Sequence, residues 1–168
     1  MNDYEYSDQF HIISTLVEDK PGVLQKVSSL FTRRGFNIES ITVGKSEVPD
    51  LSRMVIIVNG NRKVLEQVIK QLNKLIDVVK VKDLNPKHSV ARELCLIKVK
   101  SEDEKSKLEI LQYVDIFRAK VIDICDNSLI IEVTGDVGKI NALISLLNSH
   151  GIEKIARTGS TAMSRGNY

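Results

Sequence analysis

Bulky aromatic side chains are scarce in this sequence of 168 residues: tryptophan is absent and aromatic residues make up only 5%. Aliphatic side chains must therefore build any hydrophobic core. Hydrophobic residues at 42% and charged residues at 27% are typical of a globular protein. Long apolar runs are also missing, because none approaches the roughly 18 residues that a membrane-spanning helix needs. The composition therefore argues against a membrane protein.

A surplus of one charge is missing too. The 24 basic and 22 acidic residues are interspersed and leave a formal net charge of +2. A nucleic-acid-binding surface needs basic residues gathered on one face, so the even mixture argues against a nucleic-acid partner. Residues 1–6 are acidic and polar, unlike a secretory signal. We therefore expect a cytoplasmic protein.

The sequence also lacks the residue clusters that carry catalysis or metal binding. Its two cysteines, Cys95 and Cys125, lie far apart in apolar segments, which favours two free, buried thiols over a disulfide or a metal pair. The three histidines share no spacing that suggests metal ligation; they are His11, His88 and His150. We predict no catalytic residue and no metal ligand in this chain.

The sequence does contain an internal repeat of one structural unit. The hydrophobic periodicity predicts a strand, a helix, two strands, a helix and a strand over residues 10–84, and the same order over residues 94–157. Apolar positions of the second helix repeat between the copies: Leu65, Val68, Ile69 and Leu72 correspond to Ile140, Leu143, Ile144 and Leu147. We therefore predict an α+β protein of two tandem ferredoxin-like (βαββαβ) domains, residues 1–85 and 86–168.

The turn after the first predicted strand is the strongest candidate for a binding site. Pro21 suits the first position of a helix, where its missing N–H would have no intrahelical partner. Gly22 lets a ligand approach the backbone closely. The free N–H groups around Gly22 and Val23 lie at the positive end of the helix dipole and can bind a small anion. Taken alone, the same residues also fit an ordinary turn.

A free amino acid suits this turn. Its carboxylate would take the helix N–H groups, and its ammonium would find an acceptor in the Asp19 carboxylate or the Asn37 side-chain carbonyl. Leu24 and Ile38 can line a small apolar pocket for a branched side chain. If the strand that begins at Asn37 lies beside the first strand, its amide sits near the same helix N-terminus.

The second copy lacks this site. Lys105, Ser106 and Val121 stand where the first copy has Pro21, Gly22 and Asn37. We therefore expect an effector site within residues 10–84 only.

Around this turn the sequence resembles an ACT domain, a small module that often binds amino acids. Several segments make the resemblance more specific: Arg34-Gly-Phe-Asn-Ile-Glu-Ser-Ile-Thr-Val43, Leu51-Ser-Arg-Met54, Lys63-Val-Leu-Glu-Gln67 and Gln71-Leu-Asn-Lys-Leu-Ile-Asp-Val78. They look like the regulatory (small) subunits of acetolactate synthase, also called acetohydroxyacid synthase. The resemblance extends to Gly159 and Ser164-Arg-Gly166.

The resemblance implies a non-catalytic subunit in the biosynthesis of valine, isoleucine and leucine. Such a chain would activate a large catalytic subunit, which would hold thiamine diphosphate, magnesium and FAD, and would mediate feedback inhibition by valine. Carried over to this sequence, the implied effector site comprises Asp19, Pro21, Gly22, Val23, Leu24, Asn37 and Ile38. The family pattern often has asparagine where this chain has Asp19.

Two further expectations complete the interpretation. An open four-stranded sheet has exposed edges, and pairing two copies covers them, so we expect a homodimer through the N-terminal halves with the effector at or near the interface. The alternative to a synthase subunit is a free-standing amino-acid-sensing ACT protein that controls another enzyme or a regulator.

Overall fold

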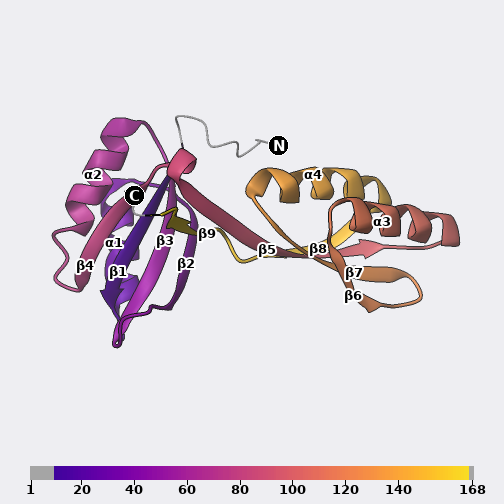
Figure 1. Cartoon of the computed structure of the whole chain (residues 1–168), viewed down its shortest axis with the longest axis horizontal. Helices are drawn as coiled ribbons and strands as arrows, with labels where there is room; N and C mark the ends of the chain where they lie inside the picture. The colour runs from indigo at the N-terminus through magenta and orange to yellow at the C-terminus, as the bar shows by residue number, and fades with distance from the viewer. Residues whose placement is uncertain (1–9, 167–168) are drawn as a thin grey trace. The chain divides into compact units, whose positions relative to one another are not determined.

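The computed structural model describes residues 10–166, which form two compact units (Figure 1). The first unit contains residues 10–91 and 160–166, and the second contains residues 92–159. The chain therefore enters the second unit after Ala91 and returns to the first after Gly159. The domains expected from the sequence, 1–85 and 86–168, differ from these units because residues 86–91 and 160–166 belong with the first unit.

The first unit has the predicted βαββαβ order. Its elements are β1 (Phe10–Glu18), α1 (Val23–Arg34), β2 (Ile38–Lys45), β3 (Leu51–Asn59), α2 (Arg62–Leu72) and β4 (Val78–Leu84). The strands pair antiparallel in the order β2-β3-β1-β4. Because β1 and β2 both run antiparallel to β3, they are parallel to each other, with α1 as the crossover between them.

The second unit repeats this arrangement, which confirms the predicted pair of ferredoxin-like folds. Its elements are β5 (Ser89–Lys100), α3 (Glu104–Ile116), β6 (Lys120–Ile124), β7 (Ser128–Gly135), α4 (Val137–Leu147) and β8 (Ile152–Arg157), with β5 beginning in the first unit. The strand order β6-β7-β5-β8 matches that of the first sheet. Two short 3-10 turns complete the assignment: η1 (Pro86–His88) and η2 (Asn148–His150).

Aliphatic side chains form a separate core in each unit, between the helices and one face of the sheet. In the first unit α1 contributes Val23, Val27, Leu30 and Phe31, all at most 5% exposed. In the second unit the core includes Ile97, Ile131 and Leu143. The apolar positions that repeat between α2 and α4 lie in or against these cores, as their periodicity predicted. Leu24 of α1 is 47% exposed.

The two cysteines are free, as predicted, but only Cys95 is buried. Burial raises the pKa of the Cys95 thiol to about 11. Cys125 is exposed, so the prediction of a second buried thiol was wrong. The reason is that β6 ends at Ile124, which leaves Cys125 in the hairpin before β7.

The segment after the second unit forms a ninth strand, β9 (Thr161–Ser164), which pairs with β5 and lies against β1 and β4. Ala162 is 5% exposed and packs with Ile12, Val55 and Leu84 on the helix-free face of the first sheet. The sequence periodicity predicts no element in the tail after residue 157. In the structure it covers the first unit of its own chain.

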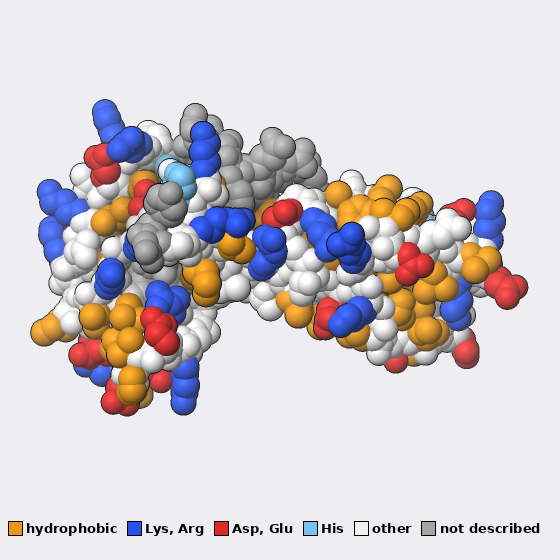
Figure 2. All heavy atoms as spheres, in the orientation of Figure 1, with side chains coloured by type: hydrophobic (Ala, Val, Ile, Leu, Met, Phe, Trp, Pro, Cys, Tyr) orange, Lys and Arg blue, Asp and Glu red, His pale blue; other side chains and the backbone are white. Residues whose placement is uncertain are grey.

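Basic and acidic side chains are interspersed over the face of the molecule shown in Figure 2. No helix within residues 10–166 is long and apolar enough to cross a membrane. Among the same residues, no group of three or more His, Cys, Asp or Glu side chains could hold a metal ion.

Candidate functional site

The turn between β1 and α1 has the geometry of a type II turn. Val23 N–H points to Lys20 O at 3.5 Å, and Gly22 has φ 87° and ψ −10°. Proline fits the second position of such a turn and glycine the third, where φ is positive. Pro21 therefore precedes the helix, which begins at Val23, and the prediction that Pro21 opens the helix was wrong. A Cβ on Gly22 would meet nothing within 4 Å, so the positive φ, not close packing, requires glycine.

The helix that follows this turn begins without a side-chain cap. Each of the other α-helices in the described chain has one: Asn61 caps α2, Asp103 caps α3 and Asp136 caps α4. The first intrahelical bond of α1 runs from Lys26 N–H to Gly22 O, at 3.0 Å. Within residues 10–166, the N–H groups of Leu24 and Gln25 have no acceptor. Free donors at the positive end of a helix dipole attract an anion.

Asp19 lies close in sequence to this open helix end. It is held in place by Ser52 in β3 and by Asp50, the residue before β3. Its backbone N–H donates to Asp50 O at 2.8 Å, and its Oδ1 accepts a hydrogen bond from Ser52 Oγ at 3.2 Å. Ser52 is 6% exposed, whereas Asp19 is exposed. The carboxylate is therefore fixed on one side and can still accept from a cationic group in solvent.

A buried carboxylate adds a charge cluster that sequence reasoning missed. The side chain of Asp77 is 2% exposed and accepts from Lys26 Nζ at 2.5 Å. Lys20 Nζ lies 3.1 Å from Asp77 Oδ1, which lacks a well-aligned hydrogen bond, so that contact is an ion pair. Lys20 also pairs with Glu18.

These contacts shift the ionisation of the cluster. The hydrogen bond from Lys26 and then the close contact with Lys20 hold the pKa of Asp77 below its ordinary value. The close contacts with Glu18 and then with Asp77 raise the pKa of Lys20. Lys20 therefore stays cationic next to the turn that precedes α1. Nothing in the local sequence around Asp77 signals this role, because the contact between Lys26 and Asp77 joins residues 51 positions apart.

Asn37 and Ile38 lie at the other end of the sheet. Ile38 pairs with Val58, which pairs with His11 near the start of β1, whereas Asp19 follows the end of β1. The seven steps from His11 to Glu18 span about 23 Å at roughly 3.3 Å per residue. A parallel crossover returns the chain to the end where the first strand began. The expectation that Asn37 lies near the α1 N-terminus of its own chain was therefore wrong.

The individual side chains of the predicted site also differ in what they can offer. Asn37 Nδ2 donates to Glu39 Oε1 at 2.8 Å, and Ile38 packs against the core. The side chain of Val23 is 3% exposed and belongs to the core, so only its backbone faces the turn. Leu24, beside the free N–H groups, exposes an apolar side chain. One chain thus brings together Asp19, Pro21, Gly22, Val23 and Leu24, but not Asn37 and Ile38.

Two family models match the chain. Residues 13–80 match the AHAS small subunit-like ACT domain, and residues 92–166 match the small subunit of acetolactate synthase. The probable acetolactate synthase small subunit of Methanothermobacter thermautotrophicus is 58% identical over 162 residues, covering 96% of both chains. This chain belongs to the acetolactate synthase small subunits.

Other members of the family agree with this assignment. The acetolactate synthase small subunit of Mycobacterium bovis is 51% identical, covering 95% of each chain. The crystal structure of the small subunit from Thermotoga maritima is 51% identical and superposes with a TM-score of 0.88, covering 95% of this chain and 99% of that one. Membership gives the chain a regulatory, non-catalytic role in acetolactate synthase, an enzyme of branched-chain amino acid biosynthesis. It also implies a large catalytic partner.

Proposed function

We propose that this small subunit activates the catalytic subunit of acetolactate synthase and mediates its feedback inhibition by valine. The observation that carries the effector site is the uncapped N-terminus of α1, with free N–H groups on Leu24 and Gln25. In this proposal the catalytic subunit holds thiamine diphosphate, magnesium and FAD, and this chain supplies no reacting group.

The chemistry of valine matches the groups at this helix end. Its carboxylate accepts hydrogen bonds from the free N–H groups, where the helix dipole favours negative charge. Its ammonium group donates to the Asp19 carboxylate, which Ser52 holds in place. Its isopropyl group packs on Leu24, which is otherwise half exposed. Lys20 and Lys26 are paired with Asp77 and Glu18, so this cluster adds no net charge beside the site.

Dimerisation explains how Asn37 can belong to the same site. Strand β2 is an edge of the first sheet, and its end at Lys45 pairs with Ser52, next to Asp19. If two β2 edges pair antiparallel, the start of one β2 lies beside the end of the other. Asn37 of the partner subunit then approaches the α1 N-terminus from across a two-fold axis. We therefore propose a homodimer through the first units, with two equivalent sites at the interface.

Titration of the chain into its purified catalytic subunit tests this function directly. We expect acetolactate formation to rise with added small subunit and to fall again when valine is added. Co-purification of the two chains and calorimetric valine binding to the small subunit alone are the matching physical measurements. A chain that binds valine but neither associates with nor activates the catalytic subunit would support the free-standing sensor instead.

A further inference from the structure

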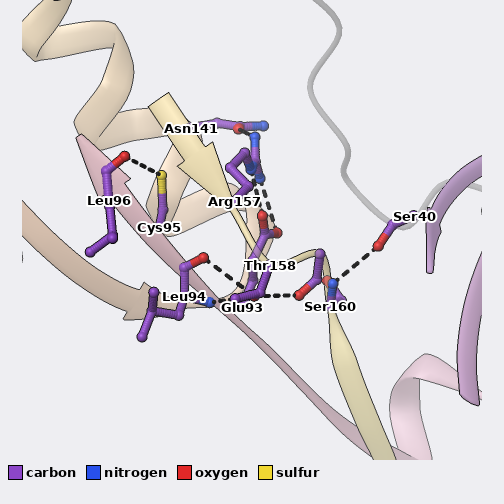
Figure 3. Close-up of polar contacts among 10 residues, drawn as sticks. Ser40, Glu93, Leu94, Cys95, Leu96, Asn141, Arg157, Thr158 and Ser160 are labelled. Atoms are coloured by element: carbon purple, nitrogen blue, oxygen red, sulfur yellow. Dashed lines mark hydrogen bonds and ion pairs between the residues drawn. The ribbon is translucent and has the colours of Figure 1, made fainter. Parts of the chain in front are cut away.

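The first residue after the second unit is hydrogen-bonded to the strand that carries Asn37 and Ile38. Ser160 N–H donates to Ser40 Oγ at 3.2 Å (Figure 3). Thr42 Oγ1 donates to Ser160 O at 3.1 Å. Ser160 is 2% exposed. Ser40 and Thr42 pair with Ile57 and Val55, so they lie on the helix-free face of the sheet. Two β2 side chains therefore hold both backbone groups of one buried residue.

The residues just before this point are held equally well within the second unit. Arg157 forms a bidentate pair with Glu93, from Nε to Oε1 at 2.5 Å and from Nη2 to Oε2 at 3.0 Å (Figure 3). Glu93 is 5% exposed. Thr158 N–H then donates to Leu94 O at 3.1 Å. Only Gly159, with φ 79°, separates Thr158 in the second unit from Ser160 in the first.

The rest of the tail holds Ser160 against the first sheet. Ala162 is buried against Ile12 and Val55, and Lys82 Nζ donates to Ser164 Oγ at 3.3 Å. Arg165 N–H donates to His88 O at 2.7 Å. A displacement of β2 must therefore move Ser160 or break its bonds to Ser40 and Thr42.

Strand β2 is the part of the first sheet best suited to respond to an effector. It is an edge strand, and its pairing with β3 is irregular between Ile38 and Ser40. Bulges of this kind occur next to functional sites and loosen the ladder locally. An effector that contacts the Asn37 end of β2 can thus favour one position of the strand, and such a difference in affinity between two states is what allosteric control requires.

We propose that Ser40 and Thr42 couple the effector site to the second unit by holding Ser160. In this view they are positioning residues that do not touch valine, and the change passes through Gly159 to the clamped pair Arg157 and Glu93. The inference rests on the proposed function at α1, and it goes beyond that function by assigning the route of the signal.

The test uses Thr42→Val, which removes the hydroxyl at nearly constant shape, and Thr42→Ser, which keeps it. Ser40→Ala removes the acceptor for Ser160. Ser46→Ala is the control, because within residues 10–166 its hydroxyl bonds only to Val48 in its own loop. Each variant is assayed as the complex with catalytic subunit, and valine binding to each small subunit is measured by calorimetry. We expect unchanged activation and unchanged valine affinity for all four variants.

The valine response should separate them. In Thr42→Val and Ser40→Ala, half-inhibition should need about two- to tenfold more valine, which corresponds to one net hydrogen bond. Thr42→Ser and Ser46→Ala should behave as wild type. Full valine sensitivity in both Thr42→Val and Ser40→Ala, with binding intact, overturns this inference and leaves the proposed function standing. If valine does not inhibit the wild-type complex, both this inference and the proposed feedback inhibition are wrong.

Discussion

The two units share one fold, but the first helix starts differently in each. In the repeat, Asp19 corresponds to Asp103, and α3 begins at Glu104, directly after it, whereas α1 begins only at Val23. Asp103 Oδ1 accepts from Ser106 N–H at 2.7 Å and closes the helix end. The Pro-Gly turn of the first unit shortens the helix by almost one turn, so Asp19 bonds to Ser52 instead. A two-residue difference thus converts a closed helix end into an open one.

The largest expected effect comes from placing a negative charge at the uncapped N-terminus of α1. Gly22→Asp should weaken valine binding at least about fivefold. Like charges at about 4 Å cost roughly 1 kcal/mol even in water and more when partly buried, and the positive φ of Gly22 disfavours any side chain. Activation of the catalytic subunit should persist. Calorimetry with valine is the measurement.

Gly22→Asn is the matched control, because it has nearly the same shape and tolerates positive φ about as well as Asp, but carries no charge. We expect its affinity to lie between wild type and Gly22→Asp. Equal affinity in Gly22→Asp and wild type would show that the α1 N-terminus does not bind the effector carboxylate.

A second prediction tests whether the site at the α1 N-terminus needs residues from two chains. Asn37→Ala should weaken valine binding about two- to tenfold, the value of one net hydrogen bond. Mixing Gly22→Asp chains with Asn37→Ala chains after unfolding and refolding should restore wild-type affinity at one site per mixed dimer, because both substitutions then fall in the other site. Recovery of tight sites, counted by calorimetry, supports the shared site. No recovery in confirmed mixed dimers would place both residues in one chain's site or in none.

The Asp103 cap of α3 predicts that the stability of the second unit depends on pH. The backbone N–H of Ser106 holds the pKa of Asp103 below its ordinary value. A carboxylate whose folded pKa lies below its unfolded pKa stabilises the fold above the unfolded value, about 3.9, and this is lost as the pH falls through the folded value. Asp103→Ala should lower the urea midpoint at pH 7, and the difference from wild type should shrink towards pH 2.

Asp103→Asn is the control for charge, since it keeps an N-cap acceptor that does not titrate. Its midpoint should stay closer to wild type at pH 7 and depend less on pH. A difference between wild type and Asp103→Ala that is constant from pH 7 to pH 2 would contradict the role of the ionised cap. Circular dichroism can follow the loss of helices and strands. Tryptophan fluorescence cannot serve, because the chain has no tryptophan.

Much of this architecture could be predicted from local patterns, because the helix and strand periodicities agree with burial in both units. The position of Asn37 could have been derived as well. A βαββαβ order with β2 parallel to β1 requires the crossover to end where β1 begins. The tail could not be predicted, since β9 is short and polar and is ordered by contacts with residues such as Ile12, far away in sequence. The Asp77 cluster was missed for the same reason.

The smallest expected effect comes from opening the closed end. Lys105→Pro with Ser106→Gly would place the Pro-Gly turn of the first unit at the start of α3. Proline is tolerated in the first turn of a helix, and glycine within a helix costs about 0.5–1 kcal/mol, so the second unit should remain folded with slightly lower stability. In a Gly22→Asp background, calorimetry should detect no valine binding beyond that of Gly22→Asp alone. An open helix end alone provides donors for the carboxylate, but Val121 stands where the first unit has Asn37 and offers no polar group. Valine binding above that of Gly22→Asp alone would show that the Pro-Gly turn is sufficient, and that the amide at position 37 is not part of what separates the two units.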